Sequence, residues 1–263
     1  MAAEAATGSL QEQVMVWIEH HTMANPDVWH PLPFMNIPLP GFLSLHAVML
    51  LLCGLFLVII FGVLYRKRDE VPCGWTNFLE LFICFVRDEI CIPNIGEADG
   101  RRMTPLFCSF FFFILGLNMM GLIPLFSTAT GNISVTLGLA SITLFFMIGG
   151  GIYRNGFGGF FKSLIPHGVP WPIAIILFPI EMVGLLVKPF ALTIRLFANM
   201  LAGHIVLFSL ISLAVVFGMA AAVPAVLMGA GIYLLEIFVA LLQAYIFTML
   251  SAMFVGACLH PAH

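Results

Sequence analysis

The sequence has very few charged residues for its length. Aspartate, glutamate, lysine and arginine together make up 9% of its 263 residues, whereas they form about a quarter of a typical soluble domain. Hydrophobic residues account for 61% of the chain, and the mean hydropathy is +1.08. The composition therefore excludes an ordinary soluble protein and indicates an integral membrane protein.

Several motifs that would indicate other functions are also lacking. The six cysteines show no CxxC spacing, and neither a GxGxxG motif nor a P-loop occurs. We therefore expect no metal, no cofactor and no nucleic-acid partner, and a chain that is not itself an enzyme. His20, His21 and His30 in the N-terminal segment are expected to face solvent rather than to bind a metal. The first 40 residues lack a basic stretch followed by an apolar one, so no cleavable signal is expected.

Long, unbroken apolar runs divide the chain and favour helices over the alternating pattern of a β-barrel. The last two runs, 171–217 and 222–259, would measure roughly 70 Å and 57 Å as straight helices, against a hydrocarbon core of about 30 Å. Each is therefore either two crossings or one tilted helix. The predicted organisation is an external N-terminal segment (1–41), a first transmembrane helix (42–65), a cytoplasmic segment (66–103), a transmembrane hairpin (104–153), a cytoplasmic loop (154–170) and a tilted hairpin (171–263).

The ten lysines and arginines are unevenly distributed along these segments. Eight of them fall in 66–103 and 154–170, whereas 1–41, 127–132 and 218–221 contain none. By the positive-inside rule, the N-terminus is expected outside and the two basic segments in the cytoplasm. Splitting the first long run would expose Lys188 and Arg195 outside, and no glycine or proline turn accompanies Glu236 in the second. We therefore predict five crossings with a cytoplasmic C-terminus. The expected location is a bacterial inner (plasma) membrane, with an organellar membrane as the alternative.

Residues 72–95 form a different kind of segment. Their polar residues fall on one helical face and their aromatic and aliphatic residues on the others. This pattern predicts an amphipathic helix that lies on the membrane surface instead of crossing it.

Ionisable residues inside the two long runs are the main functional signal. Glu181, Lys188 and Arg195 follow each other at intervals of seven residues, so they share one side of a helix. In the last run, Glu236 and Gln243 are also seven residues apart and share a face. A charge at a helix centre costs about 3 kcal/mol on insertion scales. The pattern indicates either a buried ion pair that locks the hairpin or a polar path for ions or protons.

The residue types favour a proton path with a barrier. Glutamate and histidine can take up and release protons, whereas arginine stays charged in proteins. Asn199 lies one turn after Arg195, and His204 lies on roughly the opposite face. Because Arg195 cannot act as a relay step, we predict two half-paths with Arg195 between them. Such an arrangement requires a partner that carries the proton past the barrier.

Three segments carry a family resemblance. EMVGLLVKPFALTIRLFANMLAGHIVLF (181–208), LEIFVALLQAYIFTMLSAMFV (235–255) and FILGLNMMGLIPLF (113–126) resemble the signatures of subunit a of F-type ATP synthases. The resemblance implies an all-α membrane subunit whose last two helices form a tilted hairpin facing the c-ring. It implies a stator that couples proton translocation to ring rotation and ATP synthesis. The implied partners are the c-ring, subunit b of the peripheral stalk and the rest of the complex.

The resemblance also implies roles for individual residues. Arg195 would face the proton-carrying carboxylate of the ring, and His204 with Glu236 would form the His/acid pair of the outer half-channel, in the order opposite to that of some members. Glu181 would belong to the cytoplasmic half-channel. Further polar residues are assigned to the surroundings of the arginine or to the channel lining: Gln243, Asn199, Asn118, Asn132 and Lys188. Gly121 stands where some members have an acid.

Two other functions remain open from the residues alone. A secondary transporter usually shows internal repeats with broken helices in matching positions, and no such repeat is evident. A purely structural membrane subunit would keep its charges as locking ion pairs. The choice between H⁺ and Na⁺, the number of c-subunits and the role of Lys188 stay open.

Overall fold

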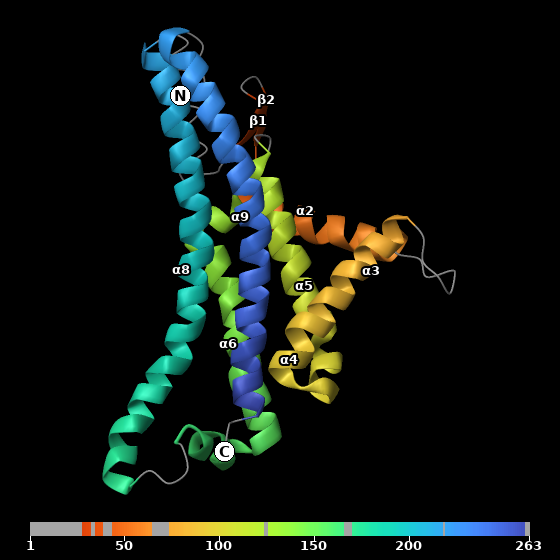
Figure 1. The fold of residues 1–263 in the computed structure, drawn as a ribbon, viewed down its shortest axis with the longest axis vertical. Helices are drawn as coiled ribbons and strands as arrows, with labels where there is room; N and C mark the ends of the chain where they lie inside the picture. Colours follow the sequence, from red (N-terminus) through yellow and green to blue (C-terminus); the bar gives the residue numbers. More distant parts are fainter. Residues whose placement is uncertain are drawn as a thin grey trace. The chain divides into compact units, whose positions relative to one another are not determined.

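The computed structural model describes residues 28–32, 35–38, 44–64, 74–123, 126–165, 170–217 and 219–260 (Figure 1). Two short strands precede a series of helices, and π-helical and 3-10 segments are interspersed among them. In chain order the elements are β1 (Val28–Leu32), β2 (Met35–Pro38), α2 (Leu45–Ile59), η1 (Ile60–Leu64), α3 (Trp75–Phe85), η2 (Val86–Cys91), α4 (Ile92–Ile95), α5 (Glu97–Leu122), η3 (Ala129–Gly131), α6 (Ile133–Asn155), α7 (Phe157–Ser163), α8 (Trp171–Phe217) and α9 (Met219–Leu259).

Five stretches of the described helices are long and apolar enough to cross a membrane. They are Leu45–Gly62, Glu97–Leu122, Ile133–Asn155, Trp171–Ala214 and Ala222–Leu259. The prediction of a helical, multi-pass membrane protein is therefore confirmed, and the described residues contain the five long apolar helices that five crossings require. Each of the two longest apolar runs forms one helix: α8 has 47 residues, with Pro179 and Pro189 inside it, and α9 has 41.

Some boundaries differ from the sequence-based expectation. Helix α5 begins at Glu97, so Arg101 and Arg102 lie within it instead of in the preceding loop. Glu97 and Asp99 occupy its first turn, where negative charge is favourable for the helix dipole. The loop expected at 154–170 contains α7, and the proline-rich N-terminal segment contains β1 and β2, which pair antiparallel.

The chain folds into two compact units, each assembled from separate stretches of sequence. Unit 1 comprises Met1–Gly54, Leu115–Asn132 and Phe197–Leu242, and unit 2 comprises Leu55–Ile114, Ile133–Leu196 and Gln243–His263. Helices α2, α5, α8 and α9 each contribute residues to both units.

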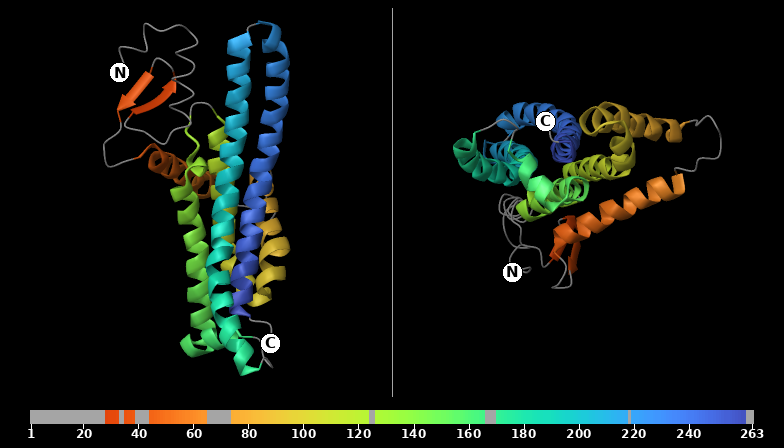
Figure 2. Two further views of the ribbon diagram at one scale, coloured as in Figure 1. Left: turned by 90° about the vertical axis from the view of Figure 1, so that its left-hand side faces the viewer. Right: turned by 90° about the horizontal axis from the view of Figure 1, so that it is seen from below.

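In unit 1, the second part of α8 and the first part of α9 run side by side in opposite directions (Figure 2). The end of α5 and the following loop are tied to α9 by the fully buried Asn118. Its Nδ2 donates to the carbonyl of Ala240 at 3.4 Å, and its Oδ1 accepts from Thr130 Oγ1 at 2.9 Å. The amide of Asn118 therefore holds α9 one turn away from Glu236.

In unit 2, aromatic side chains join the amphipathic helix α3 to its neighbours. The rings of Phe82 and Phe111 stack with centroids 5.9 Å apart, and Phe85 lies 5.8 Å from Tyr245 of α9. Trp75 and Phe78 are exposed on the same helix, as expected for a helix at a membrane surface.

The beginning of η2 carries an adjacent pair of opposite charges outside the membrane-spanning helices. Arg87 donates to the Asp88 carboxylate at 2.8 Å and 2.9 Å. These hydrogen bonds lower the pKa of the exposed Asp88 carboxyl.

Still in unit 2, the C-terminal end of α9 is fastened by polar contacts. Asp99 accepts from Arg154 of α6 and lies 3.2 Å from His260 Nε2. Asn155 Nδ2 donates to the carbonyl of Cys258 at 3.3 Å. At Gly256, a side chain would collide with the backbone carbonyl of Asn94. The close approach at Gly256 and these contacts fix the end of α9 against α4, α5 and α6.

Replacing Gly256 with alanine should destabilise the protein. The added methyl group would meet a backbone carbonyl, which cannot move aside like a flexible side chain, so we expect a loss of about 1–3 kcal/mol. Thermal unfolding in detergent measures the effect. Gly229→Ala is the matched control on the same helix, because nothing lies within 4 Å of a Cβ there. Equal melting temperatures for the two variants would contradict the close packing.

Candidate functional site

The site in unit 1 is organised around a buried carboxyl group on a membrane-spanning helix. Glu236 of α9 is only 5% exposed. Within the described part of the chain, neither of its carboxylate oxygens has a hydrogen-bond partner. A carboxylate buried without such partners is costly. Glu236 is therefore an ionisable group whose burial is not compensated by hydrogen bonds from the described residues.

His204 of α8 is the neighbour of this carboxyl group. Its Nδ1 lies 4.0 Å from Glu236 Oε1, and its side chain is 17% exposed against 5% for Glu236. The sequence predicted that these two residues would form a pair, although 32 positions separate them. Their adjacency places two proton-exchanging groups side by side.

Gly203 makes room for this arrangement. A Cβ at residue 203 would overlap the Glu236 carboxyl group, with Glu236 Cδ only 2.8 Å away. The carboxyl group therefore lies directly against the backbone of α8.

A side chain at residue 203 should consequently displace Glu236. We expect Gly203→Ala to push the Glu236 carboxyl group away from the backbone of α8 and away from His204, because the added methyl group would overlap it. The matched control is Gly231→Ala, since nothing lies within 4 Å of a Cβ at that position of α9. The rate at which a hydrophobic carbodiimide modifies Glu236, followed by mass spectrometry, would test this: we expect a changed rate in Gly203→Ala and the wild-type rate in Gly231→Ala, and equal rates in the two variants would contradict it.

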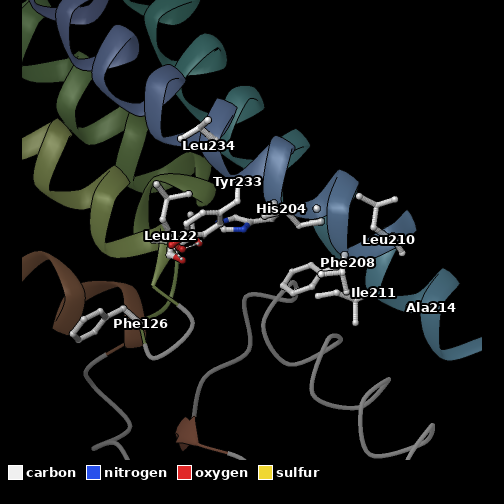
Figure 3. A pocket seen from close by; sticks show the side chains of 16 residues that line it. Leu122, Phe126, His204, Phe208, Leu210, Ile211, Ala214, Tyr233 and Leu234 are labelled. Atoms are coloured by element: carbon white, nitrogen blue, oxygen red, sulfur yellow. Dashed lines mark hydrogen bonds between the residues drawn. The ribbon is translucent and has the colours of Figure 1, made fainter. Parts of the chain in front are cut away.

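A cavity of about 770 Å³ lies beside this pair, entirely within unit 1 (Figure 3). Most of its lining is apolar and comes from α8 and α9. The side chains of Thr128, His204 and Tyr233 supply its polar groups. In Figure 3, His204, Tyr233 and Leu122 appear between Phe126 on one side and Phe208 and Leu210 on the other. His204 thus lies between the cavity and the more deeply buried Glu236.

Thr128 was not predicted from the sequence. Its Oγ1 lies 2.5 Å from His204 Nε2 and donates to the carbonyl of Gly121 at 3.4 Å. Nearby, the hydroxyl of Tyr233 donates to the carbonyl of Leu122 at 3.2 Å. Thr128 lies in a short polar loop 76 residues before His204, and nothing in the local pattern signals the contact.

Arg195 and Gln243 both belong to unit 2 but have different surroundings. Arg195 is exposed on α8, and no ion pair among the described residues includes it. An exposed arginine that forms no ion pair with the described residues can contact a partner protein. Gln243 of α9 is buried, only 3% exposed. Asn199, which belongs to unit 1, is exposed on α8.

Glu181 and Lys188 are both half-buried on α8 in unit 2. The ion pairs of the described residues do not include one between them. Lys188 Nζ instead lies 5.8 Å from the centre of the Phe254 ring, where the aromatic face attracts a cation. Lys188 thus contacts an aromatic ring, and its position does not require an ion pair with the Glu181 carboxylate.

The two remaining asparagines, Asn118 of α5 and Asn132 after η3, both belong to unit 1. The amide of Asn118 forms the hydrogen bonds with Ala240 and Thr130 that hold α9, so it has a structural role. Asn132 ends η3, where its backbone NH donates to Ala129 at 3.1 Å, and its side chain is half-buried.

Comparisons with known proteins point to one family. A family model described as ATP synthase A chain matches residues 46–256. The chain is 45% identical over 225 residues to an ATP synthase subunit a of Anaeromyxobacter sp. (strain Fw109-5), an alignment that covers 83% of this chain and 55% of that protein. It is 46% identical over 225 residues to the subunit of Myxococcus xanthus (strain DK1622), covering 83% and 73%. It is 44% identical over 247 residues to that of Chlorobium phaeobacteroides (strain BS1), covering 88% and 72%.

The relatives differ in how much of their length the chain represents. The chain spans little more than half the length of the Anaeromyxobacter protein, but nearly three quarters of the other two. The family match covers α5, α6, α8 and all but the last turn of α9, and it includes every residue of the candidate site.

Proposed function

The chain belongs to the ATP synthase A chain family, and on that premise we propose that it is the stator subunit through which protons cross the membrane to turn a c-ring. The observation that carries the proposal is the buried Glu236 carboxyl group beside His204 and a cavity. Ionisable residues inside membrane helices mark ion and proton routes, and this pair consists of two groups that exchange protons.

The outer half-path starts at the cavity in unit 1. Protons reach His204, which lines the cavity, and pass to Glu236 behind it. Glu236 and Gln243 share a face of α9, which continues the polar route along the helix. Asn118 supports the path by holding α9, and Asn132 is a further polar group of unit 1.

Arg195 separates the outer half-path from the inner one. It is exposed on α8, and its guanidinium group stays charged and cannot pass on a proton. It therefore attracts an ionised carboxylate of the ring and blocks a continuous proton wire. Asn199, one turn further on, is a polar neighbour on the same helix. Only a protonated and neutral ring carboxyl group can leave for the lipid, because a charge in hydrocarbon is costly.

The inner half-path is assigned to Glu181. After nearly a full turn of the ring, the carboxyl group releases its proton near this residue towards the cytoplasm. Lys188, held over Phe254, adds a positive charge along the same side of α8. Each proton delivers about 2.3 kcal/mol per 100 mV of membrane potential.

The partners and the orientation follow from the same proposal. The ring supplies the carboxylate, subunit b of the peripheral stalk holds the chain still, and the rest of the complex makes ATP. The basic segments place the N-terminus outside and the C-terminus in the cytoplasm of a bacterial plasma membrane.

Reconstitution tests the proposal. Vesicles that contain the ring, the peripheral stalk and the soluble motor without this chain should hydrolyse ATP without acidifying their lumen. Adding the chain should restore acidification, measured with a pH-sensitive dye. Equal acidification with and without the chain would contradict the proposal. Failure of the chain to co-purify with a ring of small hydrophobic hairpins would favour a transporter instead.

A further inference from the structure

Thr128 contacts the one ring nitrogen of His204 that does not face Glu236. Thr128 Oγ1 lies 2.5 Å from Nε2, whereas Nδ1 lies 4.0 Å from Glu236 Oε1. The imidazole is therefore placed between a hydroxyl group on one side and a carboxyl group on the other. All three residues belong to unit 1.

The hydroxyl group of Thr128 can donate its hydrogen to either of two acceptors. It can donate to the carbonyl of Gly121, 3.4 Å away, and then accept from an Nε2–H of His204. Alternatively it can donate to a bare Nε2. A threonine hydroxyl has one hydrogen and two lone pairs, so it serves either arrangement.

Each orientation of the hydroxyl selects one form of the histidine. When Thr128 accepts from Nε2–H, the neutral ring has a free lone pair on Nδ1 facing Glu236. When Thr128 donates to Nε2, the neutral ring carries its hydrogen on Nδ1. In a neutral imidazole one nitrogen is a donor and the other an acceptor, and the partner of one nitrogen fixes the state of the other.

We propose that Thr128 is a positioning residue for proton transfer, and that its hydroxyl lets His204 exchange between these two tautomers. This inference rests on the proposed function. A proton that binds Nε2 of the Nδ1–H form gives an imidazolium. Loss of the Nδ1 proton to the Glu236 carboxylate leaves the Nε2–H form, so one proton enters and one leaves. The Thr128 hydroxyl donates a hydrogen bond to the bare Nε2 of the Nδ1–H tautomer, and it accepts one from Nε2–H in the other tautomer.

The surroundings of His204 in unit 1 support this assignment. Among the described residues, the titratable groups that lie beside it or share its cavity are Glu236 and Tyr233, both from α9, and the Tyr233 hydroxyl donates to the carbonyl of Leu122. On the side of α5 and its following loop, Thr128 is the polar side chain lining the cavity. A Cβ at Gly121 would lie 3.2 Å from Thr128 Oγ1 and 3.0 Å from Met200 Cε. The glycine therefore leaves space for the hydroxyl group.

Two matched substitutions separate the hydroxyl group from the space that it fills. Thr128→Val keeps the shape and removes the hydroxyl, whereas Thr128→Ser keeps the hydroxyl and removes a methyl group. In reconstituted complexes, we expect Thr128→Val to lower proton-driven ATP synthesis about tenfold, which is the effect of losing one hydrogen bond of ordinary strength. Thr128→Ser should stay near the wild-type rate. Half-maximal synthesis should require a more acidic outside medium in Val, because the imidazolium loses an acceptor.

A measurement that does not depend on turnover covers the case in which the Val variant assembles poorly. NMR of ¹⁵N-histidine in nanodiscs, with the His204 signals assigned through His204→Ala, reports the tautomers. We expect both tautomers in the wild-type chain and in Thr128→Ser. A single fixed tautomer in the wild-type chain would overturn the inference.

The remaining outcomes are also decisive. Val and Ser with equal rates and equal pH dependence would overturn the role of the hydroxyl. If Glu236→Gln still abolished synthesis in the same experiment, the proposed function would stand without Thr128. If Glu236→Gln were fully active, the proposed function itself would fail.

Discussion

Replacing Arg195 with alanine is expected to abolish ATP-driven proton pumping by the assembled complex. Arg195 is exposed on α8 and forms no ion pair within the described residues, so its charge is available to a partner. Without it, nothing would hold the ionised ring carboxylate at the interface or prevent protons from crossing between the half-paths. Quenching of a pH-sensitive dye in vesicles during ATP hydrolysis measures the loss.

The control for this variant lies on the same helix. Ser209→Ala removes an exposed hydroxyl that donates to the carbonyl of Val206 in its own helix, at 2.8 Å. It should pump at the wild-type rate. If Arg195→Ala complexes of normal composition pumped as well as Ser209→Ala complexes, the barrier assigned to Arg195 would be wrong, and a structural role for the subunit would be favoured.

Replacing Glu236 with glutamine should lower proton-driven ATP synthesis by about 100-fold, the lower end of what a positioned proton-transfer group contributes. Glutamine has nearly the same size and can form hydrogen bonds, but it cannot carry a proton. Synthesis driven by an imposed pH difference and potential across vesicles measures the change. Glu89→Gln, an exposed position in η2, makes the same chemical change away from the site and should have no effect.

Exchanging the two partners tests whether the pair itself is required. The double variant His204→Glu, Glu236→His keeps one acid and one imidazole but reverses their order along the chain. It should regain part of the synthesis lost in either single variant. A double variant no better than the worse single variant would mean that each residue has a role tied to its own position, and not a shared one.

The sequence predicted the membrane helices and the residues that carry charge into them. Hydropathy located the five helices that are long and apolar enough to cross a membrane, because an apolar run of that length is a local feature. The absence of a turn signal near Glu236 correctly indicated that α9 is one helix. The pairing of His204 with Glu236 came from the family resemblance, and the structure places the two side chains together in unit 1.

Other features could not be predicted, because they depend on contacts between distant residues. Thr128 lies in a loop whose composition is typical of any turn, and its importance comes from a histidine 76 positions away. Asn118 was assigned to the channel lining, but its hydrogen bonds to Ala240 and Thr130 arise only when α5 meets α9. The packing of Lys188 over Phe254 likewise joins two helices.

The central claim is that protons reach the site by two half-paths that open on opposite sides of the membrane. Single cysteines at Thr128 and at Glu181, in a chain whose six native cysteines are replaced, allow a direct test with a small, membrane-impermeant thiol reagent. The account predicts that the cysteine in Thr128→Cys reacts only with reagent added outside, and that the one in Glu181→Cys reacts only with reagent added on the cytoplasmic side. Reaction of both cysteines from the same side, or of either from both sides at equal rates, would contradict it.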